Sequence, residues 1–343
     1  MAQTLEEIAQ AMVADSKGLL AADESNNSIK KRFDAVGVTN TEENRRDYRE
    51  FMFRTTDAMQ KYISGVILYD ETIRQKAKDG TPLIDIIKKM GALPGIKVDQ
   101  GPKSVPGFPG ETITDGLDGL DAKMKEYYGL GARFAKWRAV IDIGRKGDRQ
   151  MPTRYCIEAN NHALARYAAI CQANGIVPMV EPEVLMDGDH DIERNQEVTQ
   201  AVLSDLFVQL NAARVKLEGL ILKPNMVISG ALASKRAGVE EVAERTVKTF
   251  LRTVPAATAG IMFLSGGQSD QEATAHLSAM NANFKMPWKL SYSYGRALQA
   301  AAQKAWSGKA ENVAAGQKAF LHRAKMNSLA AAGNWTAELD KAA

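Results

Sequence analysis

The sequence predicts an α/β fold in which strands and helices alternate along the whole chain. Short apolar runs bounded by turn residues recur eight times along the 343 residues. Segments with helical spacing of apolar residues lie between these runs, and such alternation is typical of parallel β/α units. Eight units are the number that closes a (β/α)8 barrel, although the count alone also fits an open doubly wound sheet.

The eight predicted strands are mostly continuous apolar runs, which is the pattern of strands that are covered on both faces. They are residues 18–23, 65–70, 95–99, 134–143, 176–184, 219–226, 260–266 and 289–295. The sixth run, GLILKPNM, is unusual because Lys223 ends an otherwise apolar stretch with no turn signal before it. A buried strand that ends in an ammonium group needs a physical explanation.

Capping patterns predict where several of the intervening helices begin. The patterns are Thr4-x-x-Glu7, Asn40-x-x-Glu43 and Ser269-x-x-Glu272. The second should open a helix that continues to about Gln60. Residues 153–175 predict a further long helix, which ends with a glycine at the position where a C′ residue belongs.

Composition favours one domain over residues 1–343, with 309–343 as a C-terminal helix and short tail. The chain is 45% apolar and 25% charged, and no low-complexity linker interrupts it. The net charge of +3 is small and the basic residues are interleaved with acidic ones, so we expect no nucleic-acid partner. No window approaches the roughly 18 apolar residues of a membrane span, so we expect no membrane partner.

The N-terminal segment and the cysteines predict a cytoplasmic protein. TLEEIAQAMVAD carries two acidic residues and no apolar core, so neither a secretory nor a transit peptide fits it. Cys156 and Cys171 fall in one helical pattern. Their separation along a helix is about 22 Å at a rise of 1.5 Å per residue, which is too far for a disulfide. A reducing compartment is the simplest interpretation.

Ionisable residues stand near the carboxyl ends of most of the predicted strands. Residues i and i+2 of a strand share a face, so Lys136 should lie beside Arg138, and Glu181 beside Glu183. The other residues at these ends are Asp23, Lys97, Asp99, Lys223, Ser265 and Arg296. In a barrel they would meet at the C-terminal mouth, where active sites of this fold lie. A salt bridge explains one such pair equally well, but burying so many charges costs several kcal/mol per ion unless each is well paired.

The expected mouth is slightly cationic, which suits an anionic ligand. Four acidic residues face five basic ones, and Arg32 in the loop after the first strand adds a sixth. Two glycine-bearing turns follow the last two strands. They are Ser265-Gly266-Gly267 and Ser293-Tyr294-Gly295-Arg296. Each is also compatible with an ordinary strand-to-helix turn. In a barrel, however, this position frequently binds a phosphate at free helix N–H groups.

Lys223 is the candidate nucleophile. An amine that lies near other cations and is partly withdrawn from water favours its neutral form, so we expect its pKa to fall. A neutral amine attacks a carbonyl carbon and forms a Schiff base. Lys136 is the expected neighbouring cation, and Glu181 or Glu183 the expected proton carrier. A lysine that extends to solvent from the strand end is the simpler alternative.

A metal or another cofactor is not expected. The four histidines show no ligand spacing, and the two cysteines form no C-x-x-C pair. Only His190 lies among acidic residues, in the segment DGDHD at 187–191. We interpret that segment as a solvated loop.

Taken together, these motifs resemble the class I fructose-1,6-bisphosphate aldolases of animals and plants. The resemblance runs from about Leu5 to Ser328. Its motifs are LLAADES at 19–25, NTEENRR at 40–46, GVILYDET at 65–72, GIKVDQG at 95–101, FAKWR at 134–138, GIVPMVEPE at 175–183, LILKPNM at 220–226, FLSGGQS at 263–269 and SYGRALQA at 293–300. It implies a TIM barrel with extra N- and C-terminal helices. It also implies a metal-independent lyase of glycolysis and gluconeogenesis that cleaves fructose 1,6-bisphosphate reversibly to dihydroxyacetone phosphate and glyceraldehyde 3-phosphate.

The resemblance also implies roles for individual residues. Lys223 matches the Schiff-base lysine, Glu181 the acid/base glutamate with Glu183 beside it, Asp23 the aspartate that handles the C4 hydroxyl proton, and Lys136 a further active-site lysine. Lys97 and Arg138 match substrate-binding positions. One phosphate would lie at Ser265, Gly266, Gly267, Ser293, Gly295 and Arg296. The other would lie near Ser25, Ser28 and Arg32. The implied partner is a phosphorylated sugar, and the implied assembly is a homotetramer.

One departure from the family concerns the tail. Animal members end in a tyrosine that assists proton exchange, whereas no tyrosine follows Tyr294 here. We therefore expect removal of the last ten residues to change turnover little. Two alternatives to the fructose-bisphosphate enzyme remain from the residues. They are a Schiff-base lyase that favours sedoheptulose 1,7-bisphosphate and a catalytically idle barrel that serves as a binding or scaffold protein.

Overall fold

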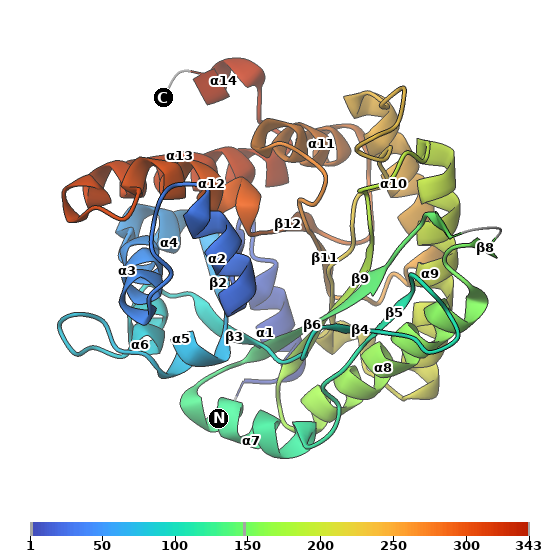
Figure 1. The fold of residues 1–343 in the computed structure, drawn as a ribbon, viewed down its shortest axis with the longest axis horizontal. Coiled ribbons are helices and arrows are strands. Elements are labelled where there is room, and N and C mark those ends of the chain that lie inside the picture. The colour runs from blue at the N-terminus through green and yellow to red at the C-terminus, as the bar shows by residue number, and fades with distance from the viewer. Residues whose placement is uncertain (1–2, 147–148, 342–343) are drawn as a thin grey trace.

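Eight parallel strands close into a barrel at the centre of the molecule (Figure 1). The computed structural model describes residues 3–146 and 149–341. The barrel strands are β1 (Gly18–Ala22), β2 (Ile63–Leu68), β3 (Leu93–Lys97), β6 (Phe134–Ile141), β9 (Val177–Val184), β10 (Ile221–Leu222), β11 (Gly260–Phe263) and β12 (Leu290–Tyr294). Each strand neighbours the next barrel strand along the chain, and β12 pairs with β1. The predicted barrel is confirmed, and the open sheet is excluded.

Helices form the outer layer around this barrel, and additional helices stand at both ends of the chain (Figure 1). They are α1 (Leu5–Met12), α2 (Asn26–Asp34), α3 (Glu42–Phe53), α4 (Thr56–Tyr62), α5 (Asp70–Arg74), α6 (Leu83–Lys89), α7 (Leu120–Leu130), α8 (Arg154–Ala173), α9 (Ile192–Ala212), α10 (Val239–Thr253), α11 (Asp270–Asn283), α12 (Arg296–Trp306), α13 (Val313–Ala331) and α14 (Ala337–Lys341). Short 3-10 turns cover Leu217–Gly219 and Ala310–Asn312. Two small antiparallel pairs, β4 (Pro102–Ser104) with β5 (Thr112–Thr114) and β7 (Arg145–Lys146) with β8 (Arg149–Gln150), lie in the loops.

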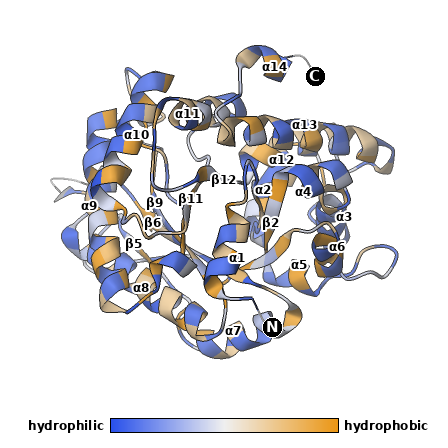
Figure 2. Ribbon diagram, turned by 180° about the vertical axis from the view of Figure 1, so that it is seen from behind, coloured by the Kyte–Doolittle hydropathy of each residue, from blue (hydrophilic) through white to orange (hydrophobic). Residues whose placement is uncertain are grey.

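Helix α1 covers the N-terminal end of the barrel (Figure 2). Its buried side chains Ile8 and Met12 join one apolar cluster with inward-facing strand residues such as Leu19 and Ile67. The predicted capping box fixes the start of this helix, because the Thr4 hydroxyl accepts a hydrogen bond from the third helical N–H at 3.2 Å. This end of the barrel is therefore closed by apolar packing, and the opposite end remains for a ligand.

The inward face of the strands changes from apolar to ionic along the barrel. Successive inward residues are Phe134 and Lys136 on β6, Met179 and Glu181 on β9, and Ile221 and Lys223 at the end of β10. Because side chains two residues apart on a strand share a face, each of these strands contributes one inward residue to the apolar cluster and the next one to the mouth. The hydrophobic layer beneath the ionic residues thus holds them at one level.

The helix predicted from Asn40 differs from the structure in its start and its length. The capping residue is Thr41, whose hydroxyl accepts from the Asn44 N–H at 3.1 Å. The prediction of one continuous helix to about residue 60 was wrong, because α3 ends and α4 begins around Thr55. The Thr55 hydroxyl donates to the carbonyl of Phe51 at 2.9 Å, and its backbone leaves the helical region. Such local competition by threonine is not visible in apolar spacing.

The predicted strand 219–226 is also shorter than expected. Only two residues of it, forming β10, belong to the barrel. The Lys223 N–H still donates to the Val180 carbonyl at 2.8 Å, and the Pro224 carbonyl accepts from the Leu264 N–H after β11 at 3.1 Å, but Pro224 itself has no N–H to donate. The following residues up to 230 are buried without regular structure. Lys223 therefore stands at the point where the chain leaves the sheet.

The C-terminal helix α14 is attached to the body by an ion pair. Both carboxylate oxygens of Asp340 accept from Arg323 on α13 at 2.9 and 2.8 Å. The two side chains are only 3% and 5% exposed. Burial alone would raise the pKa of Asp340, but the hydrogen bonds from Arg323 outweigh it and lower the pKa. Arg323 also donates to the backbone carbonyl of Asp270 and to the Thr274 hydroxyl near the start of α11, so the pair connects three helices.

We expect the substitution Asp340→Ala to lower the free energy of unfolding by about 3 kcal/mol, because it leaves a buried guanidinium without its counter-ion. Since the native pKa of Asp340 is depressed, its contribution should be present at neutral pH and decrease as the pH falls below about 4. Urea denaturation at two pH values measures both effects. Glu338→Ala on the exposed side of α14 is the control. Equal stability of the two variants would contradict the prediction.

Candidate active site

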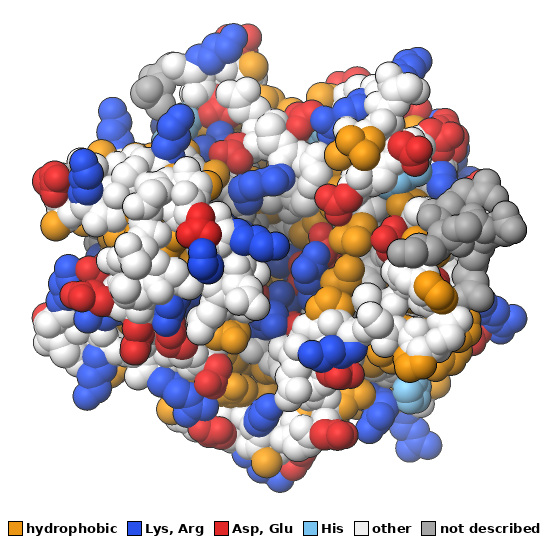
Figure 3. Space-filling model, viewed as in Figure 1, with side chains coloured by type: hydrophobic (Ala, Val, Ile, Leu, Met, Phe, Trp, Pro, Cys, Tyr) orange, Lys and Arg blue, Asp and Glu red, His pale blue; other side chains and the backbone are white. Residues whose placement is uncertain are grey.

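A cavity of about 430 Å³ opens at the C-terminal mouth of the barrel. Its volume lies within the range of about 300–1,000 Å³ that is typical of small-ligand sites. Figure 3 shows basic side chains around the hollow at the centre of this face. Among the residues predicted from the sequence, those that line it are Asp23, Ser25, Ser28, Arg32, Lys97, Lys136, Arg138, Glu181, Glu183, Lys223, Ser265, Gly266, Ser293, Gly295 and Arg296. The structure thus brings together nearly the whole predicted set.

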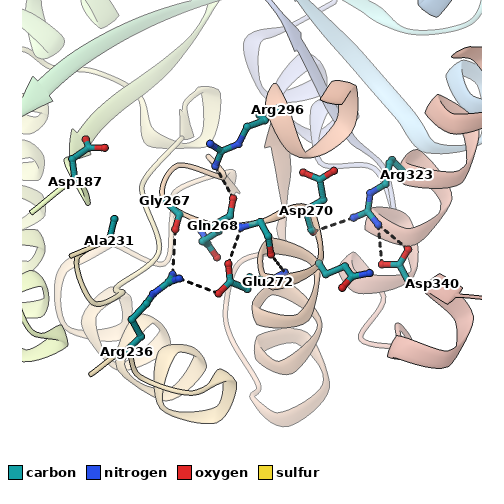
Figure 4. A pocket seen from close by; sticks show the side chains of 12 residues that line it. Asp187, Ala231, Arg236, Gly267, Gln268, Asp270, Glu272, Arg296, Arg323 and Asp340 are labelled. Atoms are coloured by element: carbon teal, nitrogen blue, oxygen red, sulfur yellow. Dashed lines mark hydrogen bonds and ion pairs between the residues drawn. The ribbon is translucent and has the colours of Figure 1, made fainter. Parts of the chain in front are cut away.

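Asp99 and Gly267 do not line this cavity, and Gly267 instead lines a neighbouring cavity of about 830 Å³ (Figure 4). Its φ of +71° is unfavourable for other residues, and a Cβ atom there would collide with Met186. Its carbonyl accepts from Arg236 at 3.2 Å. Gly267 therefore shapes the turn between the two cavities rather than facing the mouth. Arg296 lines both cavities.

Four alternating acidic and basic side chains form a continuous chain of contacts at the bottom of the mouth. Lys136 Nζ lies 2.8 Å from Asp23 Oδ2 and 3.1 Å from Glu181 Oε2. The other oxygen of Glu181 lies 3.1 Å from Lys223 Nζ. Lys136, Glu181 and Lys223 are each 4% exposed. Burial at this level demands that every charge has a partner, and the chain provides one for each.

The two carboxylates of this chain are held ionised. Burial alone would raise the pKa of Asp23, but the charges of Lys136 and Lys223 outweigh it and hold the pKa well below its usual range. The pKa of Glu181 is likewise lowered, because the same two lysines outweigh its burial. Burial would lower the pKa of Lys136, yet Asp23 and Glu181 raise it, so this amine stays charged. Lys136 and the two carboxylates therefore stabilise one another's charged forms.

The pKa of Glu183 shifts in the opposite direction. Its burial raises the pKa, and the nearby charge of Glu181 raises it further, against the effect of an ion pair with Arg138. Glu181 and Glu183 point into the same mouth from β9, as their i, i+2 spacing predicts. One strand therefore carries a carboxylate that stays ionised and a second carboxyl group that holds a proton more readily.

The surroundings of Lys223 include the Glu181 carboxylate as well as the expected neighbouring cation Lys136. The carboxylate lies between the two amines, with one oxygen 3.1 Å from each nitrogen. The alternative of a lysine extended to solvent is excluded by its burial. The neutrality of Lys223 in the free protein stays a prediction.

Lys97 forms the local ion pair that was the simpler interpretation of its spacing. Its Nζ lies 2.8 Å from Asp99 Oδ1, and it also donates to the Asp99 carbonyl at 2.9 Å. The carboxylate of Asp99 is nearly inaccessible, whereas the lysine side chain is 16% exposed toward the mouth. Lys97 can therefore present part of its charge to a ligand while it remains paired.

One helix start with free N–H groups, that of α12, faces one side of the cavity. Gly295 precedes α12 and provides no side-chain cap, so the first N–H groups of that helix are available to an anion. The buried hydroxyl oxygen of Ser293 has no hydrogen-bond partner within the described part of the chain. Arg296 donates to the carbonyl of Gln268 at 2.6 Å and so holds the turn after β11 against this helix. The arrangement can bind a phosphate.

The opposite side of the cavity is formed by the start of α2. Ser25 caps this helix through its hydroxyl, which lies 3.1 Å from the hydroxyl of Ser28. Arg32, one helical turn further, pairs with Glu24. Its guanidinium also approaches Gly295, where a Cβ atom would lie 3.3 Å from Arg32 Nη2. Arg32 thus lies between the two candidate phosphate positions rather than at one of them only.

Sequence reasoning missed Glu24 and Arg49 behind Arg32. Arg49 on α3 is fully buried, donates to the Glu24 carbonyl at 3.0 Å and lies 3.8 Å from its carboxylate. Glu24 lies beside Asp23 in the AADES motif, but strand alternation directs attention to Asp23 alone. Arg49 stands on a charged helix, and nothing in its local pattern distinguishes it from a solvated arginine.

Two further properties concern the part of the chain that the structure describes. Within residues 3–146 and 149–341, no helix has the length and hydropathy needed to cross a membrane. The same residues contain no group of three or more His, Cys, Asp or Glu side chains arranged to hold a metal ion. Cys156 and Cys171 lie on the single helix α8, and both are buried free thiols.

Comparison with known proteins identifies relatives along the whole chain. A family model described as fructose-bisphosphate aldolase class-I matches residues 4–343. A protein of Xanthomonas campestris pv. campestris named probable fructose-bisphosphate aldolase class 1 is 58% identical over 97% of this chain and 98% of its own. The fructose-bisphosphate aldolase of Dictyostelium discoideum is 51% identical over 96% of this chain and 92% of its own.

A solved structure supports the same relationship. The fructose-bisphosphate aldolase of Plasmodium falciparum, crystallised with TRAP and a small-molecule inhibitor, superposes with a TM-score of 0.94. Its sequence is 48% identical, and the match covers 97% of this chain and 95% of that one. With the closed barrel and the lysine–carboxylate mouth, these similarities lead to one conclusion: the chain belongs to the class I fructose-bisphosphate aldolase family.

Proposed function

We propose that this chain cleaves fructose 1,6-bisphosphate reversibly to dihydroxyacetone phosphate and glyceraldehyde 3-phosphate through a Schiff base on Lys223, as a lyase of glycolysis and gluconeogenesis. The observation that carries the proposal is the buried chain Asp23–Lys136–Glu181–Lys223 at the barrel mouth. It combines an amine with two ionised carboxylates in one water-poor pocket. These are the groups that imine formation and proton transfer require.

Imine formation would begin with neutral Lys223 attacking the C2 carbonyl carbon of the open-chain ketose. The resulting carbinolamine loses water when its hydroxyl group receives a proton, which Glu181 and Glu183 can relay. Glu181 Oε2 supports this role, because it has no hydrogen bond of good geometry from the described residues despite its closeness to Lys136. A substrate hydroxyl or water can occupy that position.

Bond cleavage would follow from the protonated imine, which accepts the electron pair of the breaking C3–C4 bond. Asp23 would take the proton of the C4 hydroxyl, so that C4 becomes the aldehyde carbon of glyceraldehyde 3-phosphate. The remaining enamine gains a proton at C3, and water then releases dihydroxyacetone phosphate from Lys223. Lys136 holds both Asp23 and Glu181 ionised for these transfers.

Substrate orientation would come from two phosphate positions. We assign one phosphate to the start of α12, beside the turn after β11. Its free N–H groups, Arg296 and the Ser293 hydroxyl, which has no partner among the described residues, meet there. The other would lie toward Ser25, Ser28 and the start of α2, with Lys97 and Arg138 beside the sugar chain. Arg32 can contribute to either phosphate because it lies between them. Gly266 lines the mouth, and Gly267 contributes through the shape of its turn.

We further propose a cytoplasmic homotetramer. One relative, a protein of Arabidopsis thaliana named fructose-bisphosphate aldolase 4, cytosolic, is 52% identical over 93% of this chain. The assembly rests on resemblance to the family alone. Sedimentation equilibrium should give about four times the chain mass of 37.4 kDa. A single-chain mass at micromolar concentration would contradict the tetramer.

Trapping with borohydride should locate the reactive amine. Incubation with dihydroxyacetone phosphate and sodium borohydride should reduce the imine and leave a stable adduct on the peptide that contains Lys223, as mass mapping can detect. Lys223→Met should abolish both the adduct and the cleavage of fructose 1,6-bisphosphate. Lys248→Met, an exposed lysine on α10, is the matched control and should retain both.

Each unexpected result would contradict a different part of the proposal. An adduct on another lysine would sink the assignment of Lys223, and absence of any adduct would favour the idle-barrel alternative. Cleavage that survives in Lys223→Met would exclude the Schiff-base route altogether. Comparison of kcat/KM for fructose 1,6-bisphosphate and sedoheptulose 1,7-bisphosphate would decide between the two sugar phosphates.

The pH dependence should reveal the influence of Lys136. Its charge is the strongest of those that lower the pKa of Asp23, so the native carboxylate is ionised far into the acid range. In Lys136→Met the pKa of Asp23 should rise, and a larger fraction should be protonated at each pH. The acid limb of the kcat/KM profile should therefore move upward by about one pH unit or more. Lys97→Met removes a weaker influence on the pKa of Asp23, so the acid limb should move less in this variant. Equal shifts in the two variants, or no shift in either, would contradict the role of Lys136.

A further inference from the structure

Among the described residues, no backbone hydrogen bond joins β9 to the segment that follows Lys223. The Val180 carbonyl accepts from the Lys223 N–H, and this is the last ordinary contact between β9 and β10. The next backbone groups of β9 that face β10 belong to Pro182 and Val184, because alternate residues of a strand face the same neighbour. Pro182 has no N–H, so it cannot donate to the segment that follows Lys223.

The side chain of Asn225 replaces the missing ladder contact. Its Oδ1 accepts a hydrogen bond from the Val184 N–H at 3.0 Å, next to Glu183 in the chain. Asn225 itself stands two residues after Lys223 and is 1% exposed. One buried amide thus connects the strand that carries both glutamates to the segment that carries the amine.

The orientation of this amide is fixed by its other contacts. Its Nδ2 donates to the Met226 carbonyl at 3.1 Å and to the Thr199 hydroxyl at 3.2 Å. A backbone carbonyl can only accept and the Val184 N–H can only donate, so the amide has one satisfactory orientation. Thr199 in turn contacts Asn195 one turn earlier on α9, at 3.4 Å. Both are fully buried, and α9 therefore supports the amide from behind.

We propose that Asn225 is a positioning residue that keeps Lys223 in register with Glu181 and Glu183. This inference rests on the proposed function of Lys223. The amide touches none of the reacting atoms, but it fixes the relative height of two chain segments whose ladder has ended. Loss of the amide would leave the Val184 N–H without an acceptor and would free the segment after Lys223 to shift. Shifts of about 1 Å at reacting groups can cost up to 100-fold in rate.

The test compares two buried asparagines. Asn225→Ala should lower kcat about 10-fold to 100-fold with little change in KM, and the rate of borohydride trapping at Lys223 should fall in parallel. The matched control is Asn161→Ala on α8. Asn161 is also fully buried and donates to the Val202 carbonyl and to Asp205 on α9, away from the mouth. Its loss should lower the melting temperature comparably and leave kcat unchanged.

Two further variants keep the test decisive if Asn225→Ala does not fold. Asn225→Asp retains an acceptor for the Val184 N–H and, when protonated in this buried site, a donor for its partners. It should recover most of the lost kcat. Thr199→Val keeps the shape of the threonine, removes the hydroxyl that supports the amide and should give a smaller measurable loss.

The outcomes separate this inference from the function on which it rests. If the wild-type protein gives no trapped adduct, the Schiff-base proposal fails. If the wild type is trapped and Asn225→Ala folds with unchanged kcat, the positioning role fails alone. The same conclusion follows if Asn161→Ala loses kcat equally, or if Asn225→Ala is unfolded and both Asn225→Asp and Thr199→Val match the wild type.

Discussion

The Glu181 carboxylate, shared between two buried amines, is the interaction on which the architecture of the mouth depends. Each of its oxygens lies 3.1 Å from a lysine nitrogen, and Lys136 continues to Asp23. Removing any member would leave an uncompensated charge where water is scarce, which is far more costly than removing a surface ion pair. The same mutual dependence keeps the carboxylates ionised and the groups at fixed distances. The ion pairs that stabilise the mouth are therefore the same ones that keep its carboxylates ionised for proton transfer.

Closure of the barrel is what makes this chain of charges possible. Asp23 follows β1 and Lys136 lies on β6, with β2 and β3 between them in the sheet. Three strand spacings of a flat sheet amount to about 14 Å, whereas the two groups lie 2.8 Å apart. Only the curvature of a closed barrel brings them together across the mouth. The apolar layer beneath, sealed by α1, sets the level at which they meet.

Local periodicity explains which parts of the site could be predicted from sequence. The recurrence of strands indicated the barrel, and the i, i+2 rule placed Glu181 beside Glu183 and Lys136 beside Arg138. The same rule cannot give distances between strands, so the contact of Asp23 with Lys136 was outside its reach. Fully buried Arg49 has no local signature because its burial depends on tertiary packing. Gly267 matched the phosphate turn by pattern, but its backbone geometry directs it to the neighbouring cavity.

The two glutamates of β9 illustrate how position within one strand separates chemical roles. They differ by two residues and share a face, yet Glu181 pairs with two lysines, while the ion-pair partner of Glu183 within the described residues is the more exposed Arg138. The negative charge of Glu181 itself discourages ionisation of Glu183. One carboxyl group is thereby held ready to accept a proton and the other to retain one. Two titratable groups whose pKa values are shifted in opposite directions are a common basis for assigning an acid and a base. Since the ladder beyond Val180 is interrupted at Pro182, the division also depends on how firmly β9 and the segment after Lys223 are held together.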